Sequence, residues 1–186
     1  MNIVTLVGSA RKDSYNRSIA NYIQKRYEEL LTVELVDIKD LPHFDQDQEE
    51  DPPAKVKEFK KKIKDSDGVL IVTPEYNHSV PGMLKNAIDW TSRVDHVMTG
   101  KPVLIIGSSP GMLGTVRCQL HLRQILAAPG VSAKVLPGNE VFIGMVHEKL
   151  DDQGSITDEP TIKFLDMVLH NFIKFQKEII NKTEDK

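Results

Sequence analysis

The sequence predicts an α/β fold, a three-layer αβα sandwich built around a parallel β-sheet. Short apolar runs alternate with segments of helical periodicity from one end of the chain to the other. The runs at 3–7, 68–73 and 102–107 are apolar nearly throughout, which is typical of strands that helices cover on both faces. No internal repeat or linker interrupts this alternation. We therefore expect a single domain over residues 1–181 and a polar tail over residues 182–186.

The individual elements follow from their hydrophobic patterns. The expected strands, in chain order, are residues 3–7, 33–38, 68–73, 102–107 and 133–136. The expected helices, in which apolar residues recur every three or four positions, are residues 16–31, 54–65, 83–94, 113–127 and 162–180. The second strand mixes Glu34 and Asp37 with apolar neighbours, as a strand at a sheet edge would. Because helices separate successive strands, the five-stranded sheet is expected to have the flavodoxin-like order 2-1-3-4-5.

Composition narrows the classes of function. A net charge of -3 over 186 residues gives no reason to expect nucleic acid or an anionic membrane surface as a partner. Cys118 is the only cysteine, so no intrachain disulfide can form, which fits a reducing compartment. No apolar run approaches the roughly 20 residues that span a bilayer, and no signal peptide is expected. We expect a soluble, cytoplasmic protein without a metal site, because the six histidines show no metal-ligand spacing.

Polar, glycine-rich loops follow the first, third and fourth expected strands, at 8–16, 74–79 and 107–114. Parallel strands place such loops at one edge of the sheet, where open α/β sheets bind ligands. The first loop leads from a strand into a helix, where free N–H groups attract phosphate. It lacks the G-x-G-x-x-G and G-x-x-x-x-G-K-[ST] patterns, and a plain turn capped by Ser14 or Asn16 fits it equally well. The glycines of the last loop would let the main chain approach a flat ring, although a flexible connection would contain them too.

Three motifs resemble those of a known family. They are Gly8-Ser9-x-Arg11-x-x-Ser14-x-Asn16, Pro74-Glu75-Tyr76-Asn77-x-Ser79-x-Pro81-Gly82-x-Leu84-Lys85-Asn86-Ala87-x-Asp89-Trp90, and Ser108-Ser109-x-Gly111-x-x-Gly114. Together they resemble the NADPH-dependent FMN reductase family, most closely its chromate/quinone reductase and azoreductase branch. Residues 102–105 and 117–126 add to this resemblance, which spans the chain from residue 1 to about residue 175.

The resemblance implies a flavodoxin-like fold, one FMN per subunit, and a homodimer or homotetramer. It implies an NADPH- or NADH-dependent oxidoreductase that reduces quinones, azo compounds, flavins or chromate by ping-pong, two-electron hydride transfer. No catalytic side chain is expected, because the flavin N5 carries the hydride. The residues that the resemblance assigns to FMN are Ser9, Arg11, Ser14, Tyr15, Asn16, Pro74, Glu75, Tyr76, Asn77, Ser108, Ser109 and Gly111. The first loop would hold the phosphate, the second would lie along the ring, and the third would approach the ring.

Two other functions stay open at this point: a flavodoxin-type electron carrier, and a redox sensor that uses its flavin as the signal. Arg11 and the small net charge argue against the carrier, since such carriers resemble a Ser/Thr-rich phosphate loop and a more acidic chain. The sequence does not choose the physiological acceptor. It also does not choose between NADPH and NADH, because no residue that reads the ribose or its 2′-phosphate can be placed. Dimer and tetramer stay equally open.

Several side chains suggest functional roles that their place in the sequence disfavours. Glu75 would oppose the formation of an anionic reduced flavin. We therefore expect its side chain to point toward a helix terminus or a partner subunit, and only its main chain to face the ring. Tyr76 suits either a flavin contact or a subunit interface. We expect His78 to face solvent and Cys118 to be a packed, unreactive thiol.

Two further patterns concern surfaces. The lysines at 60–62 and 64 have acidic neighbours, which predicts a solvated helix face in place of a nucleic-acid site. Met83, Trp90 and Val94 form a stripe along the helix that follows the second loop. This stripe suits either the core or a subunit contact, and its position next to the ring loop favours the subunit contact.

Overall fold

The computed structural model describes residues 1–184, with side chains through Asn181. Its strands are β1 (Asn2–Val7), β2 (Thr32–Val36), β3 (Gly68–Thr73), β4 (Pro102–Ser108), β5 (Lys134–Val135) and β6 (Val141–Ile143). Its helices are α1 (Tyr15–Arg26), the 3-10 turn η1 (Gln46–Gln48), α2 (Ala54–Asp65), α3 (Gly82–Thr91), α4 (Val116–Ala127), the 3-10 turn η2 (Val146–Glu148) and α5 (Glu159–Glu184). Of the expected polar tail, residues 182–184 continue α5 and residues 185–186 lie outside the described chain.

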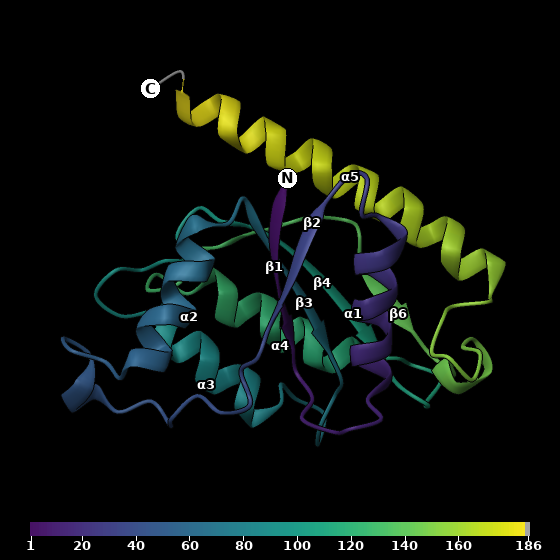
Figure 1. Cartoon of the computed structure of the whole chain (residues 1–186), viewed down its shortest axis with the longest axis horizontal. Coiled ribbons are helices and arrows are strands. Elements are labelled where there is room, and N and C mark those ends of the chain that lie inside the picture. The colour runs from purple at the N-terminus through teal and green to yellow at the C-terminus, as the bar shows by residue number, and fades with distance from the viewer. Residues whose placement is uncertain (185–186) are drawn as a thin grey trace.

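The sheet has the expected strand order, β2-β1-β3-β4-β5, and all of these strands pair in parallel. The register brings the central strands to one level at their carboxyl ends: Val7 lies opposite Val72, and Thr73 lies opposite Gly107. The loops that leave β1, β3 and β4 therefore start side by side. Figure 1 shows the loop after β1 at the edge of the sheet that faces away from the N-terminus.

Two apolar cores lie on the two faces of the sheet, as a sandwich requires. Alternate residues of the strands pack against α1 and α5 on one face, and against α2, α3 and α4 on the other. β3 is buried at every position, because helices cover both of its faces. Figure 1 shows α5 as a long helix that passes close to the N-terminus. Within residues 1–184, no helix has a stretch that is both long and apolar enough to cross a membrane.

The fifth strand differs from the expected single segment at 133–136. β5 pairs with the first residues of β4, and β6 pairs separately with its last residues, Ile106 to Ser108. Pro137 and Gly138, whose φ is 65°, turn the chain out of the sheet between the two pieces. β6 has only three residues, which is too short to show a strand pattern in the sequence.

Three expected helix ends also move, each for a local reason. α1 stops at Arg26, and its cap, Tyr27, donates its N–H to Ile23 O. α4 begins at Val116 because Gly114 has a positive φ of 60° and cannot continue a helix. α3 ends at Thr91, before Val94, which has a φ of 58°.

Trp90 corrects the expected subunit contact. Its side chain is 1 % exposed, its Nε1–H donates to Pro42 O at 2.9 Å, and the ring of Phe44 meets it edge-on at 5.0 Å. A side chain whose N–H is already hydrogen-bonded and whose ring is buried inside one protomer has no surface left to contact a partner subunit. The predicted stripe also loses Val94, which lies beyond the helix. The preference for a subunit contact was wrong for Trp90, which belongs to the core.

Candidate functional site

The loops after β1, β3 and β4, here called the first, second and third loops, meet at two side-chain contacts. The amide of Asn16 makes two hydrogen bonds to the main chain of Ser108: Nδ2 donates to Ser108 O and Oδ1 accepts from Ser108 N, both at 3.0 Å. Ser9 Oγ lies 3.5 Å from the hydroxyl of Tyr76. The Asn16 contact joins the first loop to the third loop. The contact between Ser9 and Tyr76 joins the first loop to the second loop.

The first loop ends in a capped helix. Ser14 is the N-cap of α1, and its Oγ accepts the N–H of Arg17 at 3.3 Å. The first N–H groups of a helix have no partner within it, so Tyr15 and Asn16 can offer main-chain donors to an anion. The side chain of Asn16 is 3 % exposed and already bonded to Ser108. Its contribution to a ligand is thus limited to its N–H and to the placement of the loops.

Arg11 is an exposed cation of the first loop. Its guanidinium donates to Asp13 O at 2.9 Å and lies 5.8 Å from the ring of Tyr15. No carboxylate among the described residues pairs with it, and the side chain is exposed. Its N–H donates to the buried Oγ of Ser9 at 3.3 Å, which fixes the main chain beneath it. An unpaired guanidinium at a helix N-terminus is a suitable partner for a phosphate monoester.

The second loop contains a tight turn from Tyr76 to Ser79. The N–H of each residue donates to the carbonyl of the other, at 3.1 and 2.9 Å. The two central residues, Asn77 and His78, have φ of 50° and 60°, as in a type I′ turn. Both are exposed, and Tyr76 is 45 % exposed. The prediction that His78 faces solvent is confirmed, while Tyr76 leans toward Ser9 and could still serve a ring or a subunit.

Glu75 points away from the loops and into the N-terminus of α4. Its Oε2 accepts the N–H groups of Arg117 at 2.9 Å and Cys118 at 3.0 Å. The guanidinium of Arg117 lies 3.8 Å from the other carboxylate oxygen. The expectation that this side chain would seek a helix terminus is confirmed. Two helix N–H groups and the positive end of the helix dipole compensate its charge.

Close main-chain contacts hold the third loop in place. Ser109 Oγ donates to Gly114 O at 2.8 Å, and Met145 N donates to Gly111 O at 3.2 Å. A Cβ atom at Gly144 would lie 2.2 Å from Met112 O, so the chain after β6 presses directly on the loop. These contacts predict a fixed support in place of the flexible connection that the sequence also allowed.

Ser108 carries an unsatisfied hydroxyl at this edge of the sheet. The residue is 1 % exposed, and its Oγ has no hydrogen-bond partner among the described residues. A buried hydroxyl without a partner costs free energy, so such groups usually mark a strained position or a site that receives another group. It lies on the strand end that Asn16 ties to the first loop.

Cys118 lies below the second loop, at the start of α4. It is fully buried, and its Sγ lies 3.9 Å from Thr73 Oγ1. Burial raises the pKa of this thiol to about 11, and the nearby Glu75 carboxylate raises it further against a lowering hydrogen bond from Thr73. The prediction of a packed thiol is confirmed. Within the described chain, no group of three or more His, Cys, Asp or Glu side chains is placed to hold a metal ion.

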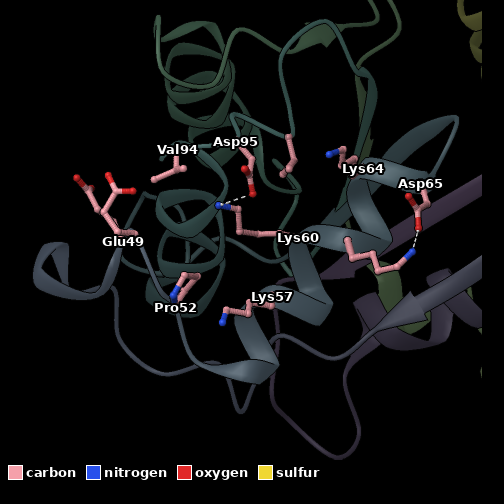
Figure 2. A pocket seen from close by; sticks show the side chains of 11 residues that line it. Glu49, Pro52, Lys57, Lys60, Lys64, Asp65, Val94 and Asp95 are labelled. Carbon is pink, nitrogen blue, oxygen red and sulfur yellow. Dashed lines mark hydrogen bonds and ion pairs between the residues drawn. The ribbon is translucent and has the colours of Figure 1, made fainter.

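A cavity of about 450 Å³ lies away from the three loops, between α2 and the chain that follows α3 (Figure 2). Lys60 is 5 % exposed there; its Nζ donates to Arg93 O at 3.0 Å and lies 3.2 Å from Asp95. The prediction of a solvated lysine face is thus wrong for Lys60, although Lys61 and Lys64 do face solvent. Two ion pairs lie within its lining, Lys60 with Asp95 and Lys61 with Asp65, and none of the residues assigned to FMN lines it. The three loops therefore stay the candidate functional site.

Comparison with known proteins decides the family. The family model of the NADPH-dependent FMN reductases matches residues 1–148. The chain belongs to this family. A quinone reductase of Escherichia coli strain K12 is 45 % identical over 184 residues, covering 96 % of this chain and 97 % of the relative. Subunit 2 of an NADH-dependent flavin reductase from Lactobacillus johnsonii is 41 % identical over 183 residues, covering 96 % of this chain and 98 % of the relative.

A solved structure agrees with this family assignment. FerB, a flavoenzyme NAD(P)H:(acceptor) oxidoreductase from Paracoccus denitrificans, has 39 % identity and a TM-score of 0.87, with 95 % of this chain and 97 % of FerB covered. As a member of the FMN reductase family, the chain is an oxidoreductase whose cofactor is FMN and whose electron donor is NAD(P)H. The three loops fit FMN chemically: an unpaired guanidinium and helix N–H groups suit the phosphate, and the unsatisfied Ser108 Oγ offers a further polar contact.

Several residues that support the site have roles that the sequence does not predict. Asn16 is predicted as an FMN ligand, but its amide joins two loops. Ser79 Oγ lies 3.1 Å from Nδ1 of His121 on α4, a contact between residues 42 positions apart that no local pattern reveals. Gly144 was overlooked because its role depends on Met112, which is distant in sequence. Only the positive φ of Asn77 had a local signal, since asparagine is favoured in such turns.

Proposed function

We propose that this FMN reductase family member transfers two electrons from NAD(P)H to quinones and other electron-poor acceptors, among them azo compounds, free flavins and chromate. The arrangement of the three loops carries this proposal. The first loop presents a cation and free N–H groups, and the main chain of the second and third loops lies at the same edge of the sheet. The names of relatives, quinone reductase and NAD(P)H:(acceptor) oxidoreductase, support this class of acceptor.

In this proposal the first loop binds the FMN phosphate. Arg11 supplies a charged donor, Ser9 and Ser14 supply hydroxyls, and Tyr15 and Asn16 supply N–H groups at the start of α1. The buried ends of Ser9 and Ser14 are already hydrogen-bonded, so the donors stay in place without a ligand. A site that is organised in advance loses less entropy when it binds.

The second and third loops would enclose the ring in the same proposal. Pro74 to Asn77 offer main-chain groups along one edge, and Ser108, Ser109 and Gly111 approach from the other loop. Bound FMN supplies the two-electron chemistry by taking a hydride from the nicotinamide. Because α4 compensates the charge of Glu75, this carboxylate would not strongly oppose the negative charge that FMN gains. No side-chain acid or base is assigned.

The proposal further holds that donor and acceptor use one open face in turn, which is a ping-pong scheme. One shared face explains a broad range of acceptors, since each needs only access and a suitable potential. Residues 1–181 would form one FMN-binding domain, assembled as a homodimer or homotetramer in the cytoplasm. The subunit contact would lie elsewhere than at Trp90, which is inside the protomer.

An anaerobic titration tests the function. The FMN-loaded protein is mixed with NADH or NADPH and the flavin absorbance is followed, then a quinone is added. We expect bleaching by at least one nucleotide, followed by reoxidation with one quinone per flavin. Reduction by neither nucleotide would refute the oxidoreductase, and would favour the electron carrier. Double-reciprocal plots that intersect, in place of parallel lines, would refute the ping-pong scheme alone.

A further inference from the structure

The turn of the second loop cannot hold its conformation by packing. Asn77 and His78 both have positive φ, which residues with a Cβ atom adopt only at a cost. Such conformations persist when the surrounding structure over-determines them. Yet both residues are exposed, and Tyr76 is half-exposed. Specific hydrogen bonds must therefore stabilise the conformation of this turn, because packing does not.

The two main-chain bonds between Tyr76 and Ser79 give the turn its shape, but they do not fix it relative to the rest of the molecule. Side chains at its two ends do so. Before the turn, Glu75 bonds to the N–H groups at positions 117 and 118 of α4. After the turn, Ser79 Oγ lies 3.1 Å from Nδ1 of His121. Positions 117, 118 and 121 share one side of the helix, a single turn apart, so α4 holds both ends.

We propose that His121 is a positioning residue for the cofactor site, acting through Ser79. It would hold the turn, and with it the main chain of Tyr76 and Asn77, at a fixed place relative to α4. The inference rests on the proposed function, because that function places this main chain along the FMN ring. A serine hydroxyl can both donate and accept. The contact therefore suits either tautomer of His121, and the residue acts by geometry.

His121 can be replaced without threat to the fold. Its side chain is exposed on α4, and alanine has the higher helix propensity. We expect His121→Ala to release the turn, so the amide hydrogen of Ser79, which bonds to Tyr76 O, exchanges faster in the protein without FMN. We also expect the Kd for FMN, measured by quenching of FMN fluorescence, to rise about three- to tenfold, the range of one net hydrogen bond.

Two variants separate positioning from general stability. His121→Asn places an amide group near the position of Nδ1 and should restore both the slow exchange and the FMN affinity. His96→Ala is the matched control, because His96 is also exposed, has a φ of 45° and bonds through Nδ1 to Gly130 O at 2.9 Å. We expect His96→Ala to leave the Ser79 exchange rate and the Kd for FMN unchanged.

A double-mutant cycle with Ser79→Ala closes the test. If the two side chains act through their bond, Ser79→Ala should match His121→Ala, and the double variant should be no worse than either. Full additivity would overturn the inference, as would equal effects of His121→Ala and His96→Ala. Normal FMN binding by His121→Ala would overturn this inference alone. A wild-type protein that does not bind FMN would overturn both this inference and the proposed function.

Discussion

At the scale of single residues, Glu75 shows how an acidic side chain can lie beside the proposed site of a cofactor that gains negative charge. Its carboxylate accepts two N–H groups at the start of α4. This end of a helix carries a partial positive charge. The side chain therefore serves as a helix cap and as an anchor of the second loop. The same residue type, left exposed on the turn, would raise the free energy of the reduced cofactor.

Arg11 provides the first prediction about a residue. Replacing it with alanine should weaken FMN binding by about 1.5–3 kcal/mol, the range for a hydrogen bond to a charged group. The measurement is titration of the protein without flavin, followed by fluorescence. Lys12→Ala is the control, because Lys12 is an exposed cation in the same loop without an assigned role. Equal losses in the two variants would mean that only overall charge matters at this loop.

Cys118 provides the second prediction about a residue. Burial raises the pKa of its thiol to about 11, so very little thiolate is present at pH 8. We expect the folded protein to react with iodoacetamide far more slowly than the protein unfolded in guanidinium chloride, where the thiol is accessible. Mass spectrometry after timed quenching measures both rates. Rapid modification of the folded protein would contradict the packed, unreactive state and would reopen a redox role.

At the scale of elements, the contact between the third loop and the chain after β6 is tight enough to forbid a side chain. A Cβ atom at Gly144 would lie 2.2 Å from Met112 O and 3.0 Å from Gly111 O. We expect Gly144→Ala to lower the free energy of unfolding by about 1–3 kcal/mol, as overpacking does. Chemical denaturation measures the change.

Gly82→Ala is the matched control for this prediction. Gly82 begins α3 with no atom within 4 Å of an added Cβ. Alanine there should be neutral or stabilising by up to about 1 kcal/mol, because it restricts the unfolded chain. If Gly144→Ala proved as harmless as Gly82→Ala, the third loop would be able to move aside, and its role as a fixed support would be wrong.

The contact between α1 and α5 depends on pH through Asp166. Arg26 donates to both carboxylate oxygens at 2.8 Å, and Tyr27 Oη donates to one at 2.7 Å. The Arg26 hydrogen bond lowers the pKa of Asp166 against the raising effect of burial, and Tyr27 adds to the lowering. The folded pKa therefore lies below the unfolded value of about 3.9. The stabilisation that the ionised Asp166 gives to the folded protein is therefore complete at pH values above the unfolded pKa. It disappears as the pH falls through the folded pKa.

We therefore expect Asp166→Asn to lower the free energy of unfolding at pH 7 by up to about 1 kcal/mol, since the pair is partly solvated. The difference from wild type should shrink at about pH 3. Urea denaturation at the two pH values measures it. Asp152→Asn, which alters an exposed carboxylate outside any ion pair of the described residues, should show no such dependence. A difference of constant size would exclude the carboxylate charge as its source.

At the scale of the whole molecule, the fold follows closely from local patterns. The strands near 3–7, 68–73 and 102–107 were predictable because burial on both faces leaves an apolar run. Alternation of strands and helices then leaves few topologies to choose from. The split fifth strand could not be predicted, because β5 and β6 have two and three residues and depend on β4 for their hydrogen bonds.

The candidate site was predictable in its place but not in its contacts. The three loops were recognised because polar residues and glycine follow apolar strands. The roles of Asn16, Ser79 and Lys60 depend on partners 92, 42 and 33 positions away. Trp90 was misjudged for the same reason, since its partner Pro42 comes from a loop without a regular pattern. Local periodicity carries no information on which distant group a polar atom will meet.

The interruption of the fifth strand has a consequence for engineering. β5 and β6 each pair with β4 independently, and after β5 the N–H of Leu136 still donates to Val103 O, so Pro137 and Gly138 lie just outside the pairing of the sheet. Pro137 and Gly138 are exposed there, and exposed loop tips of this kind tolerate inserted sequence. A peptide or a reporter domain spliced between these two residues would emerge from the sheet edge while the flanking strand pieces stayed paired. The bond between Pro137 and Gly138 is thus a suitable insertion site for a sensor domain.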